Sequence, residues 1–202
     1  MADLKDNISI GLKVLNYHIT KNRYPLSVNF IVTYACNFHC SYCDTHSVKK
    51  YQMTTKEIKS IIHDCAEMGT RKIGFTGGEA LVRPDMEEII DYAKYKGLYV
   101  HLVSNGSWVD KKLHILKKLD TLFISLDGPI EITKLQRDDY DVVSAIKLAV
   151  ENGIRVCALT TLTKNNTKKE VIDYITDKAK EIGFVNMYQP VTHFSFSSNK
   201  VD

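Results

Sequence analysis

The stretch that decides the fold is LSVNFIVTYACNFHCSYC, residues Leu26–Cys43. Its first half is an apolar run rich in Val, Ile and Phe, which predicts a buried β-strand. Its second half is a short polar loop that holds three of the 5 cysteines in the chain. An odd cysteine count with a tight cluster argues against a secreted disulfide framework and favours metal binding.

Beyond this loop, patterns typical of strands and helices alternate through the rest of the sequence. Strands are expected at 71–79, 98–106, 121–128, 154–163 and 184–191, and helices at 54–69, 84–97, 110–119, 140–153 and 167–183. Capping boxes predict helix starts at Thr54, with Glu57, and at Thr167, with Glu170. A further amphipathic helix is expected at 8–20, where apolar residues recur at helical spacing.

This alternation predicts an α/β fold with a parallel sheet and right-handed crossovers. Polar or glycine-bearing motifs follow the carboxyl ends of the expected strands, where (β/α) barrels carry their active sites. A closed barrel needs eight strand–helix units and the sequence holds about six, so we expect a partial (β/α)6 TIM-like barrel. The expected divisions are an N-terminal helical segment at 1–24, a core domain at 25–191, and a polar tail at 192–202 that either ends the core or begins a further region.

Composition and charge exclude several classes of protein. The net charge is +3 and no dense Lys/Arg stripe accompanies it, so nothing indicates a nucleic-acid partner. No apolar run approaches the ~20 residues that a membrane span requires. The start, MADLKDNISIG, lacks the basic-then-apolar order of a signal peptide, and a cytoplasmic protein is expected.

The cysteine loop, residues 34–43, carries Cys36, Cys40 and Cys43 with the spacing C-x3-C-x2-C. Thiolates are soft ligands that suit iron–sulfur clusters or zinc. Together with His39 or His46 they would supply the four ligands of a structural zinc site. On a cubane cluster, three thiolates would instead leave one iron without a protein ligand. The spacing by itself leaves both interpretations open.

The order of the motifs along the chain separates these interpretations. CNFHCSYC follows the first expected strand, FTGGEALVRPDMEEII spans the end of the second, and SLDG ends the fourth. In this order the sequence resembles the radical S-adenosylmethionine (radical SAM) superfamily, from about Tyr24 to Pro190. The resemblance implies that Cys36, Cys40 and Cys43 hold a [4Fe-4S] cluster whose open iron binds SAM. It also implies reductive cleavage of SAM to methionine and a 5′-deoxyadenosyl radical that acts on a substrate.

The resemblance further implies a set of SAM-binding residues: Tyr42, Gly77, Gly78, Glu79, Ser104, Asn105, Ser125, Asp127 and Arg137. Tyr42 matches an aromatic position near the adenine. Gly77 and Gly78 lack side chains, so their backbone can approach the ligand closely. Glu79 is expected to accept a charge-assisted hydrogen bond from the SAM ammonium.

Three further members of the set lie at or after the end of the fourth expected strand. Ser125 and Asp127 match positions that face the ribose, and Arg137 matches an arginine that pairs with the SAM carboxylate. A plainer interpretation is that Ser125 and Asp127 only shape the turn into Gly128, and that Arg137 is solvated in a polar loop. Glu79 could likewise serve only as a carboxylate at a helix N-terminus.

The remaining cysteines and the residue after Glu79 give smaller signals. Cys65 falls in a helix and Cys157 in a strand, so both are expected to be buried apolar residues. Ala80 follows the Gly-Gly-Glu motif, where many members of the superfamily have proline. No cysteine follows Cys157, so this sequence holds no ligands for an auxiliary cluster near its end.

The resemblance implies SAM, a substrate and an electron donor such as flavodoxin or ferredoxin as partners. The motifs point to subgroups that act on peptides, cofactor precursors or isoprenoid lipids, and the substrate stays open. One alternative is a non-catalytic protein that uses the loop for structural zinc or a sensing cluster. Another is an incomplete enzyme whose barrel is closed by a partner or a further segment. This last alternative predicts an exposed apolar edge on the sixth strand, near Val185–Val191.

Overall fold

The structure is a computed structural model that describes residues 25–45 and 51–190, together with six positions between Ile8 and Ile19. Those six positions are helical and exposed, which agrees with the helix expected at 8–20. His46, Val191 and the tail at 192–202 lie outside the described residues. The expected divisions at 24/25 and 191/192 therefore stay predictions.

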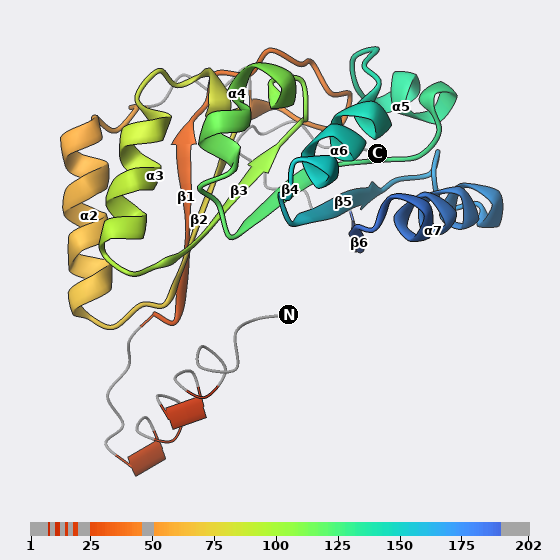
Figure 1. The fold of residues 1–202 in the computed structure, drawn as a ribbon. Helices are drawn as coiled ribbons and strands as arrows, with labels where there is room; N and C mark the ends of the chain where they lie inside the picture. Colours follow the sequence, from red (N-terminus) through yellow and green to blue (C-terminus); the bar gives the residue numbers. More distant parts are fainter. Residues whose placement is uncertain are drawn as a thin grey trace.

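Six parallel strands form one sheet in the order β1-β2-β3-β4-β5-β6 (Figure 1). The strands are β1 Ser27–Thr33, β2 Lys72–Gly77, β3 Tyr99–Ser104, β4 Thr121–Ser125, β5 Val156–Leu162 and β6 Val185–Pro190. Within the described part of the chain, β1 and β6 each pair on one side only, so the sheet stays open. The predicted α/β class and partial barrel are confirmed.

Helices connect the strands and pack against one face of the curved sheet (Figure 1). They are α2 Thr55–Glu67, α3 Met86–Tyr95, α4 Val109–Leu116, α5 Ile130–Gln136, α6 Val142–Glu151 and α7 Lys169–Ile182, with a 3-10 helix η2 at Ala80–Val82. Each parallel strand pair needs such a crossover, because the chain must return to the same edge before the next strand begins.

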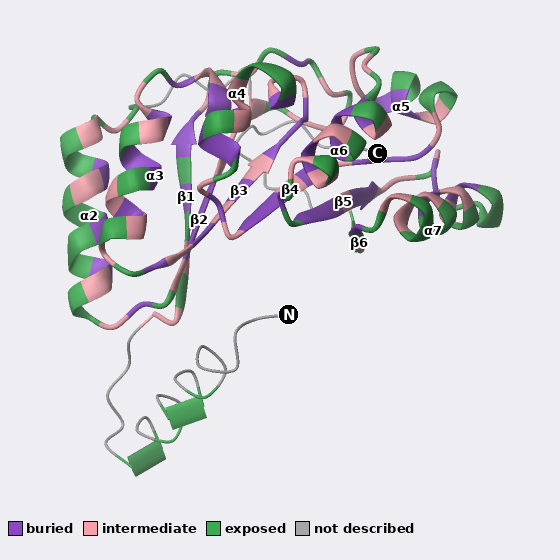
Figure 2. Ribbon diagram, viewed as in Figure 1, coloured by how far each residue is buried: buried purple, intermediate pink, exposed green. Residues whose placement is uncertain are grey.

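The hydrophobic core lies between the sheet and these helices. Alternate strand residues point toward the helices, and Ile73, Phe75, Leu102 and Leu122 are fully buried there. Figure 2 shows buried residues concentrated along the central strands and exposed residues on the outer sides of the helices. The opposite, concave face of the sheet carries both polar and apolar side chains, and the site described below lies on this side.

The helix starts test the sequence signals in detail. The capping box of Thr54 and Glu57 is confirmed at the start of α2. The prediction of a second capping box, at Thr167 and Glu170, is wrong. Helix α7 begins at Lys169, its N-cap is Lys168, and no side chain caps it. No helix is predicted at α5 from the sequence: residues 134–141 are interpreted as a polar loop that contains Arg137, and residues 130–133 have no assignment.

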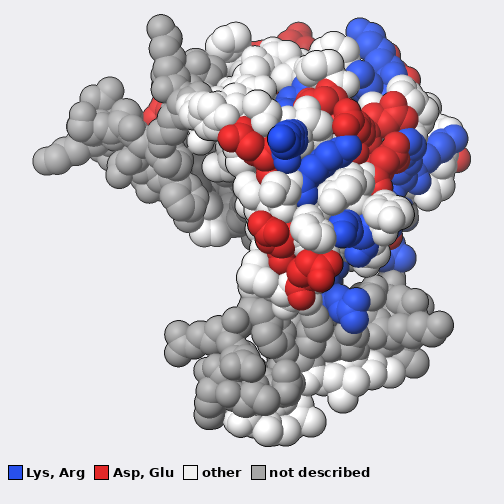
Figure 3. Space-filling view, turned by 90° about the vertical axis from the view of Figure 1, so that its left-hand side faces the viewer, with Lys and Arg blue, Asp and Glu red and all other residues white. Residues whose placement is uncertain are grey.

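Charges of both signs interleave on the face seen in Figure 3, which turns the left-hand side of Figure 1 toward the viewer. Ion pairs lie on the surface: Lys59 pairs with Glu88 between α2 and α3 at 2.5 Å, and Lys118, which follows α4, pairs with Glu87 of α3 at 2.8 Å. Among the described residues, no helix combines the length and the apolar character that crossing a membrane would require.

Candidate active site

The cysteine loop leaves the carboxyl end of β1 and lies against the Gly-Gly-Glu motif that ends β2. The Gly78 N–H donates to the carbonyl of Thr33 at 2.9 Å, and the Glu79 N–H donates to the carbonyl of Ala35 at 2.9 Å. These two bonds continue the pairing of β1 and β2 beyond the strands themselves. They fix the start of the cysteine loop one residue before Cys36.

Glycine is required at both motif positions for a reason of packing. A Cβ on Gly77 would lie 2.2 Å from the carbonyl oxygen of Thr33, and one on Gly78 would lie 2.2 Å from that of Ala35. Gly77 also has a φ of 140°, which other residues rarely adopt. The glycines therefore let the backbone approach the cysteine loop, in addition to any ligand they approach.

The far side of the cysteine loop is held by residues distant in sequence. The Ser41 N–H donates to the carbonyl of Gln136 at 2.9 Å, at the end of α5. Asn37 accepts a hydrogen bond from Asn105 Nδ2 at 3.0 Å and donates to Ser107 Oγ at 2.9 Å. The loop is thus fastened to β2, to the end of β3 and to α5.

A cavity of about 170 Å³ lies at the carboxyl edge of the sheet beside the loop. It is lined by Cys36, Phe38, Cys40, Tyr42, Cys43, Thr45, Gly77, Gly78, Val103, Ser104, Asn105, Ser125, Arg137, Leu159, Thr161 and Gln189. The three expected thiol ligands and most of the expected SAM-binding residues therefore meet at one place. The two exceptions are Glu79 and Asp127, which are buried behind the cavity wall.

The thiols differ in their surroundings. Burial raises the pKa of Cys36, and it raises the pKa of Cys40 to about 11, although the nearby Arg137 guanidinium acts in the opposite direction. Arg137 Nη1 lies 3.6 Å from Cys40 Sγ. Among the described residues, no three metal-binding side chains converge closely enough to hold a single ion, so the ligand assignment stays a prediction.

Glu79 is fully buried and ties β2 to β3. Its Oε2 accepts from the Asn105 N–H at 2.7 Å and from Ser104 Oγ at 3.1 Å. Its Oε1 accepts from the Leu81 N–H at 3.1 Å and so caps η2. Glu79 therefore does lie at a helix start, and its expected bond to the SAM ammonium stays a prediction. Burial raises the pKa of Glu79, against the effect of these hydrogen bonds.

Asp127 is also fully buried and organises three partners. Its Oδ2 accepts from Arg137 Nε at 2.6 Å and from the Tyr42 hydroxyl at 3.0 Å, while its Oδ1 accepts from the Thr161 N–H at 3.0 Å. Asp127 does not line the cavity, and protein groups bind both of its oxygens, so the expectation that it faces a ligand stays a prediction. Ser125 does line the cavity.

Arg137 is held in place by this carboxylate. Its side chain is only 10% exposed, and its guanidinium lies over the Tyr42 ring at 5.3 Å. Burial lowers its pKa, but the combined effects of Asp127, Tyr42 and Cys40 exceed that of burial and leave the pKa raised. The interpretation of Arg137 as a solvated loop residue is wrong, because α5 carries it into the site.

Sequence reasoning missed several residues that line the cavity, among them Phe38, Leu159, Thr161 and Gln189. Thr161 and Gln189 follow the pattern that marked the other candidates, since each is a polar residue near the carboxyl end of a strand. Of the remaining candidates, His39 is exposed and does not line the cavity, and His46 lies outside the described residues. Cys65 and Cys157 are buried, as predicted.

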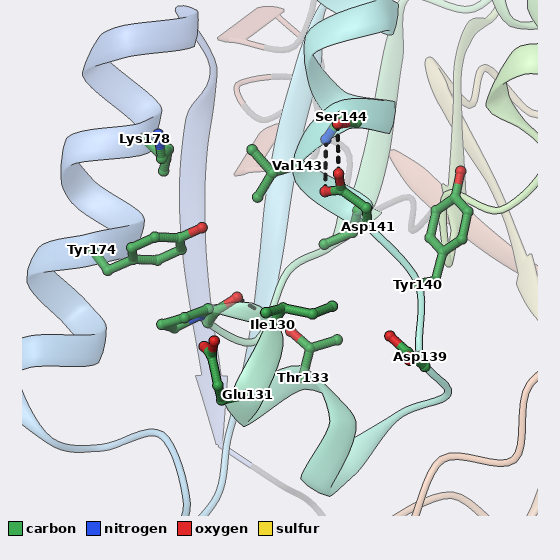
Figure 4. A pocket seen from close by; sticks show the side chains of 13 residues that line it. Ile130, Glu131, Thr133, Asp139, Tyr140, Asp141, Val143, Ser144, Tyr174 and Lys178 are labelled. Carbon is green, nitrogen blue, oxygen red and sulfur yellow. Dashed lines mark hydrogen bonds between the residues drawn. The ribbon is translucent and has the colours of Figure 1, made fainter.

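A larger groove of about 550 Å³ lies elsewhere, among α5, α6 and α7 (Figure 4). Tyr174 and Lys178 line it from α7, and Asp141 and Ser144 line it from the start of α6. The hydrogen bonds drawn there join Asp141 to Ser144 and cap that helix. The thiols do not line this groove, so the cavity beside the cysteine loop is the candidate active site.

A partial parallel barrel whose first strand leads into a loop of three thiols defines a class of α/β protein with a soft-ligand site at its carboxyl edge. Residues 30–177 match the family described as the Radical SAM superfamily. This match spans more than half of the chain, so the chain belongs to the radical SAM superfamily. The cofactors of that superfamily are a [4Fe-4S] cluster and SAM.

The chain is 30% identical over 169 residues to the probable GTP 3′,8-cyclase of Methanococcus maripaludis, which covers 79% of this chain and 57% of that protein. It is 27% identical over 195 residues to the S-adenosylmethionine-dependent nucleotide dehydratase of Flammeovirga pacifica, over 88% and 67% of the two chains. The structure of Streptococcus suis SuiB bound to S-adenosylmethionine has a similar fold, with a TM-score of 0.79 at 15% identity over 91% of this chain and 45% of that one. The chain therefore spans about half to two thirds of the length of these proteins.

Proposed function

We propose that this chain is a radical SAM enzyme that holds a [4Fe-4S] cluster on Cys36, Cys40 and Cys43 and binds SAM in the adjoining cavity. When bound, the cluster supplies one electron to SAM, which divides into methionine and a 5′-deoxyadenosyl radical that acts on the substrate. The observation that carries this proposal is that the three thiols and the backbone of Gly77 and Gly78 line one cavity.

The residues present fit these cofactors. Of the described residues that line the cavity, three are thiols and none is a histidine or a carboxylate. A structural zinc site needs four protein ligands, whereas a cluster that leaves one iron for SAM needs three. The donor set therefore supports the cluster over the zinc alternative.

The buried network around Asp127 would prepare the site for an anionic ligand. Asp127 holds Arg137 through Nε, and Arg137 directs Nη1 toward Cys40. Within the described structure, Nη2 has no hydrogen bond and can bind the SAM carboxylate. A guanidinium beside Cys40 also stabilises a thiolate there, because opposite charges attract strongly in a partly buried site. Asp127 is thus a positioning residue.

Glu79 would serve the opposite end of the SAM methionine. A carboxylate offers about four acceptor positions, and protein groups occupy three of those on Glu79. One position remains for the SAM ammonium, which would have to approach past the cavity wall, because Glu79 is fully buried and does not line the cavity. The pKa of Glu79 is raised by burial, and a cation beside it would restore the charged form.

We infer a nucleotide as the substrate, because two similar proteins are named for acting on one: a GTP cyclase and a nucleotide dehydratase. The substrate would lie on the concave face of the sheet, below the cavity. The electron donor would be a flavodoxin or a ferredoxin. Its route would be the outer side of the cysteine loop, where His39 and Ser41 are exposed.

The test is anaerobic. The protein is reconstituted with iron and sulfide, reduced with dithionite, given SAM, and assayed for 5′-deoxyadenosine. We expect product from the wild type and from Cys65→Ala, whose thiol is buried in α2, and no product from Cys40→Ala. Bound zinc with no SAM binding would support the structural alternative and overturn the proposal. A cluster that forms but never cleaves SAM would overturn the enzymatic part.

A further inference from the structure

A hydrogen-bonded pair lies on the concave face of the sheet, one layer below the cavity. His101 Nε2 lies 3.1 Å from Asn29 Oδ1. His101 stands two residues before Val103 on β3, and Val103 lines the cavity. Alternate residues of a strand point to the same face, so His101 lies on the cavity side of the sheet, about 6–7 Å deeper.

The contact between Asn29 and His101 depends on Gly74, which lies within a strand and not in a turn. Asn29 on β1, Gly74 on β2 and His101 on β3 are in register. A Cβ on Gly74 would lie 2.1 Å from Asn29 Oδ1 and 2.2 Å from His101 Nε2. Gly74 is not among the glycines with positive φ, so its backbone conformation does not explain it. Its lack of a side chain lets residues of β1 and β3 meet across β2.

The pairing leaves one imidazole nitrogen available to a ligand. The Asn29 Oδ1 can only accept, so Nε2 of His101 donates and carries the proton. Burial, with a smaller effect of Lys72, lowers the pKa of His101 and favours the neutral ring. In a neutral ring with Nε2 protonated, Nδ1 is a hydrogen-bond acceptor. Within the described residues, Nδ1 has no hydrogen bond, and the Phe123 ring lies edge-on to the imidazole at 5.3 Å.

We propose that His101, positioned by Asn29, determines substrate specificity by accepting a hydrogen bond at Nδ1 from the N1–H of a guanine base of the substrate. This inference rests on the proposed function, which supplies the nucleotide class and places the substrate below the cavity. A neutral acceptor fixed by a second side chain discriminates well, because a base without a matching N–H would leave polar groups unpaired. A surface histidine without such a partner could rotate and titrate, so it would not present a neutral acceptor in a fixed orientation.

Two substitutions distinguish the bond from Nδ1 to the substrate from the bond from Nε2 to Asn29. His101→Asn keeps a polar atom where Nδ1 stands and loses the bond to Asn29. His101→Gln keeps a donor where Nε2 stands and loses Nδ1. Guanosine 5′-triphosphate is the first probe. The second is 1-methylguanosine 5′-triphosphate, which lacks the N1–H donor. Binding is measured by equilibrium dialysis to the reconstituted protein in the presence of SAM.

We expect GTP to bind the wild type about fivefold to tenfold more tightly than it binds His101→Gln, the effect of one neutral hydrogen bond. His101→Asn should bind GTP more tightly than His101→Gln does, and the methylated probe should show no preference for the wild type. His114→Asn on α4 is the matched control and should bind GTP as the wild type does, because His114 is exposed.

A second readout does not depend on turnover. In protein labelled with ¹⁵N-histidine, the His101 Nδ1 resonance should be that of a free acceptor and should shift on addition of GTP. Equal GTP binding in all variants, no GTP binding by a wild type that cleaves SAM, or a shift caused equally by the methylated probe would overturn the assignment. A wild type that fails to cleave SAM would instead overturn the proposed function.

Discussion

Asp127 shows how one buried carboxylate can organise a site that it does not line. It lies at the end of β4 and accepts hydrogen bonds from Tyr42, Arg137 and the backbone of Thr161. These three partners come from the cysteine loop, the end of α5 and the end of β5. Asp127 therefore fixes the relative placement of three segments, and its effect on ligand binding is indirect.

Asp127→Asn should destabilise the fold, because it leaves the buried Arg137 without a compensating charge. Breaking a buried ion pair by changing one partner costs about 3 kcal/mol or more. Urea denaturation of the metal-free protein measures this. The matched control is Asp139→Asn, which breaks an exposed pair with Lys134 and should change the unfolding free energy by less than about 1 kcal/mol. Equal losses in the two variants would contradict the role given to Asp127.

His101 should make stability depend on pH in a defined direction. Its folded-state pKa is lowered, so the unfolded chain binds the proton more readily, and stability falls as pH decreases through the ordinary pKa of histidine. The groups that face the ring are Asn29 from β1, Lys72 from β2 and Phe123 from β4.

The measurement is the unfolding free energy at pH 7.5 and pH 5.5 for the wild type and His101→Gln. The wild type should lose more stability on acidification than His101→Gln, with a limit of about 1.4 kcal/mol for each pH unit crossed. Parallel pH profiles for the two proteins would show that His101 does not have a lowered pKa.

At the residue scale, the sequence predicted which side chains gather but not how deeply each one lies. Most expected residues line the cavity, since strand ends in a parallel sheet share one edge. Glu79 and Asp127 are buried behind it, because the backbone groups that bind them belong to neighbouring segments. Such contacts depend on tertiary packing, which local patterns do not encode.

At the scale of the elements, the Gly-Gly-Glu turn serves as a clamp on the cysteine loop. Gly78→Ala should displace it, because the new Cβ would lie 2.2 Å from the carbonyl oxygen of Ala35. We expect a loss of about 2 kcal/mol in unfolding free energy, together with reduced iron content after reconstitution. Gly97→Ala is the control: it strains a φ of 73° but meets no atom within 4 Å, so iron content should be unchanged. Full iron loading of Gly78→Ala would argue against the clamp.

The two predicted capping boxes give a test of helix starts. Thr54→Ala should cost about 1 kcal/mol, because Thr54 Oγ1 accepts from the Glu57 N–H at 3.3 Å. Thr167→Ala should cost almost nothing, because Lys168 is the N-cap of α7. Thermal or urea unfolding of both variants measures the difference. A comparable loss in Thr167→Ala would restore the sequence prediction.

The failed cap and the missed α5 have a common physical cause. Asn166 is fully buried, and its side chain donates to the carbonyls of Asp127 and Thr161 at 3.1 and 2.9 Å. This contact shapes the turn before α7, so the helix starts where tertiary structure places it. In α5, the Ser41 N–H donates to the carbonyl of Gln136, which gives the short helix a partner that its own sequence does not reveal.

At the scale of the whole molecule, the alternating pattern was enough to predict an open parallel sheet, but not what covers its last strand. The predicted apolar edge is present: Val185 and Met187 are 65% and 51% exposed, and β6 pairs only with β5 in the described structure. Natural sheets usually cover or charge such edges. This observation supports closure of the barrel by a partner or a further segment.

The exposed edge should make the chain self-associate. Val185→Lys combined with Met187→Lys should reduce the concentration-dependent mass measured by light scattering, because charge opposes strand pairing. The unfolding free energy should change by less than about 0.5 kcal/mol, since both side chains are exposed. The control is a double lysine substitution at Ile61 and Met68, exposed residues of α2 and its C-terminus. Equal reductions in mass by the two double substitutions would show that self-association does not depend on the β6 edge.

The separation of the cysteine loop from its anchors also governs when the site can form during synthesis. The ribosome delivers the thiols early, but Ser41 bonds to a residue 95 positions later, and His39 bonds to Asp138. Domains generally fold as units during synthesis, and the anchors of this loop lie at and just beyond the end of α5. The cysteine loop therefore cannot reach its final conformation until α5 has been synthesised, and its thiols stay unanchored until then. Iron–sulfur assembly would then be a late event, and oxidation of the waiting thiols would compete with it throughout translation.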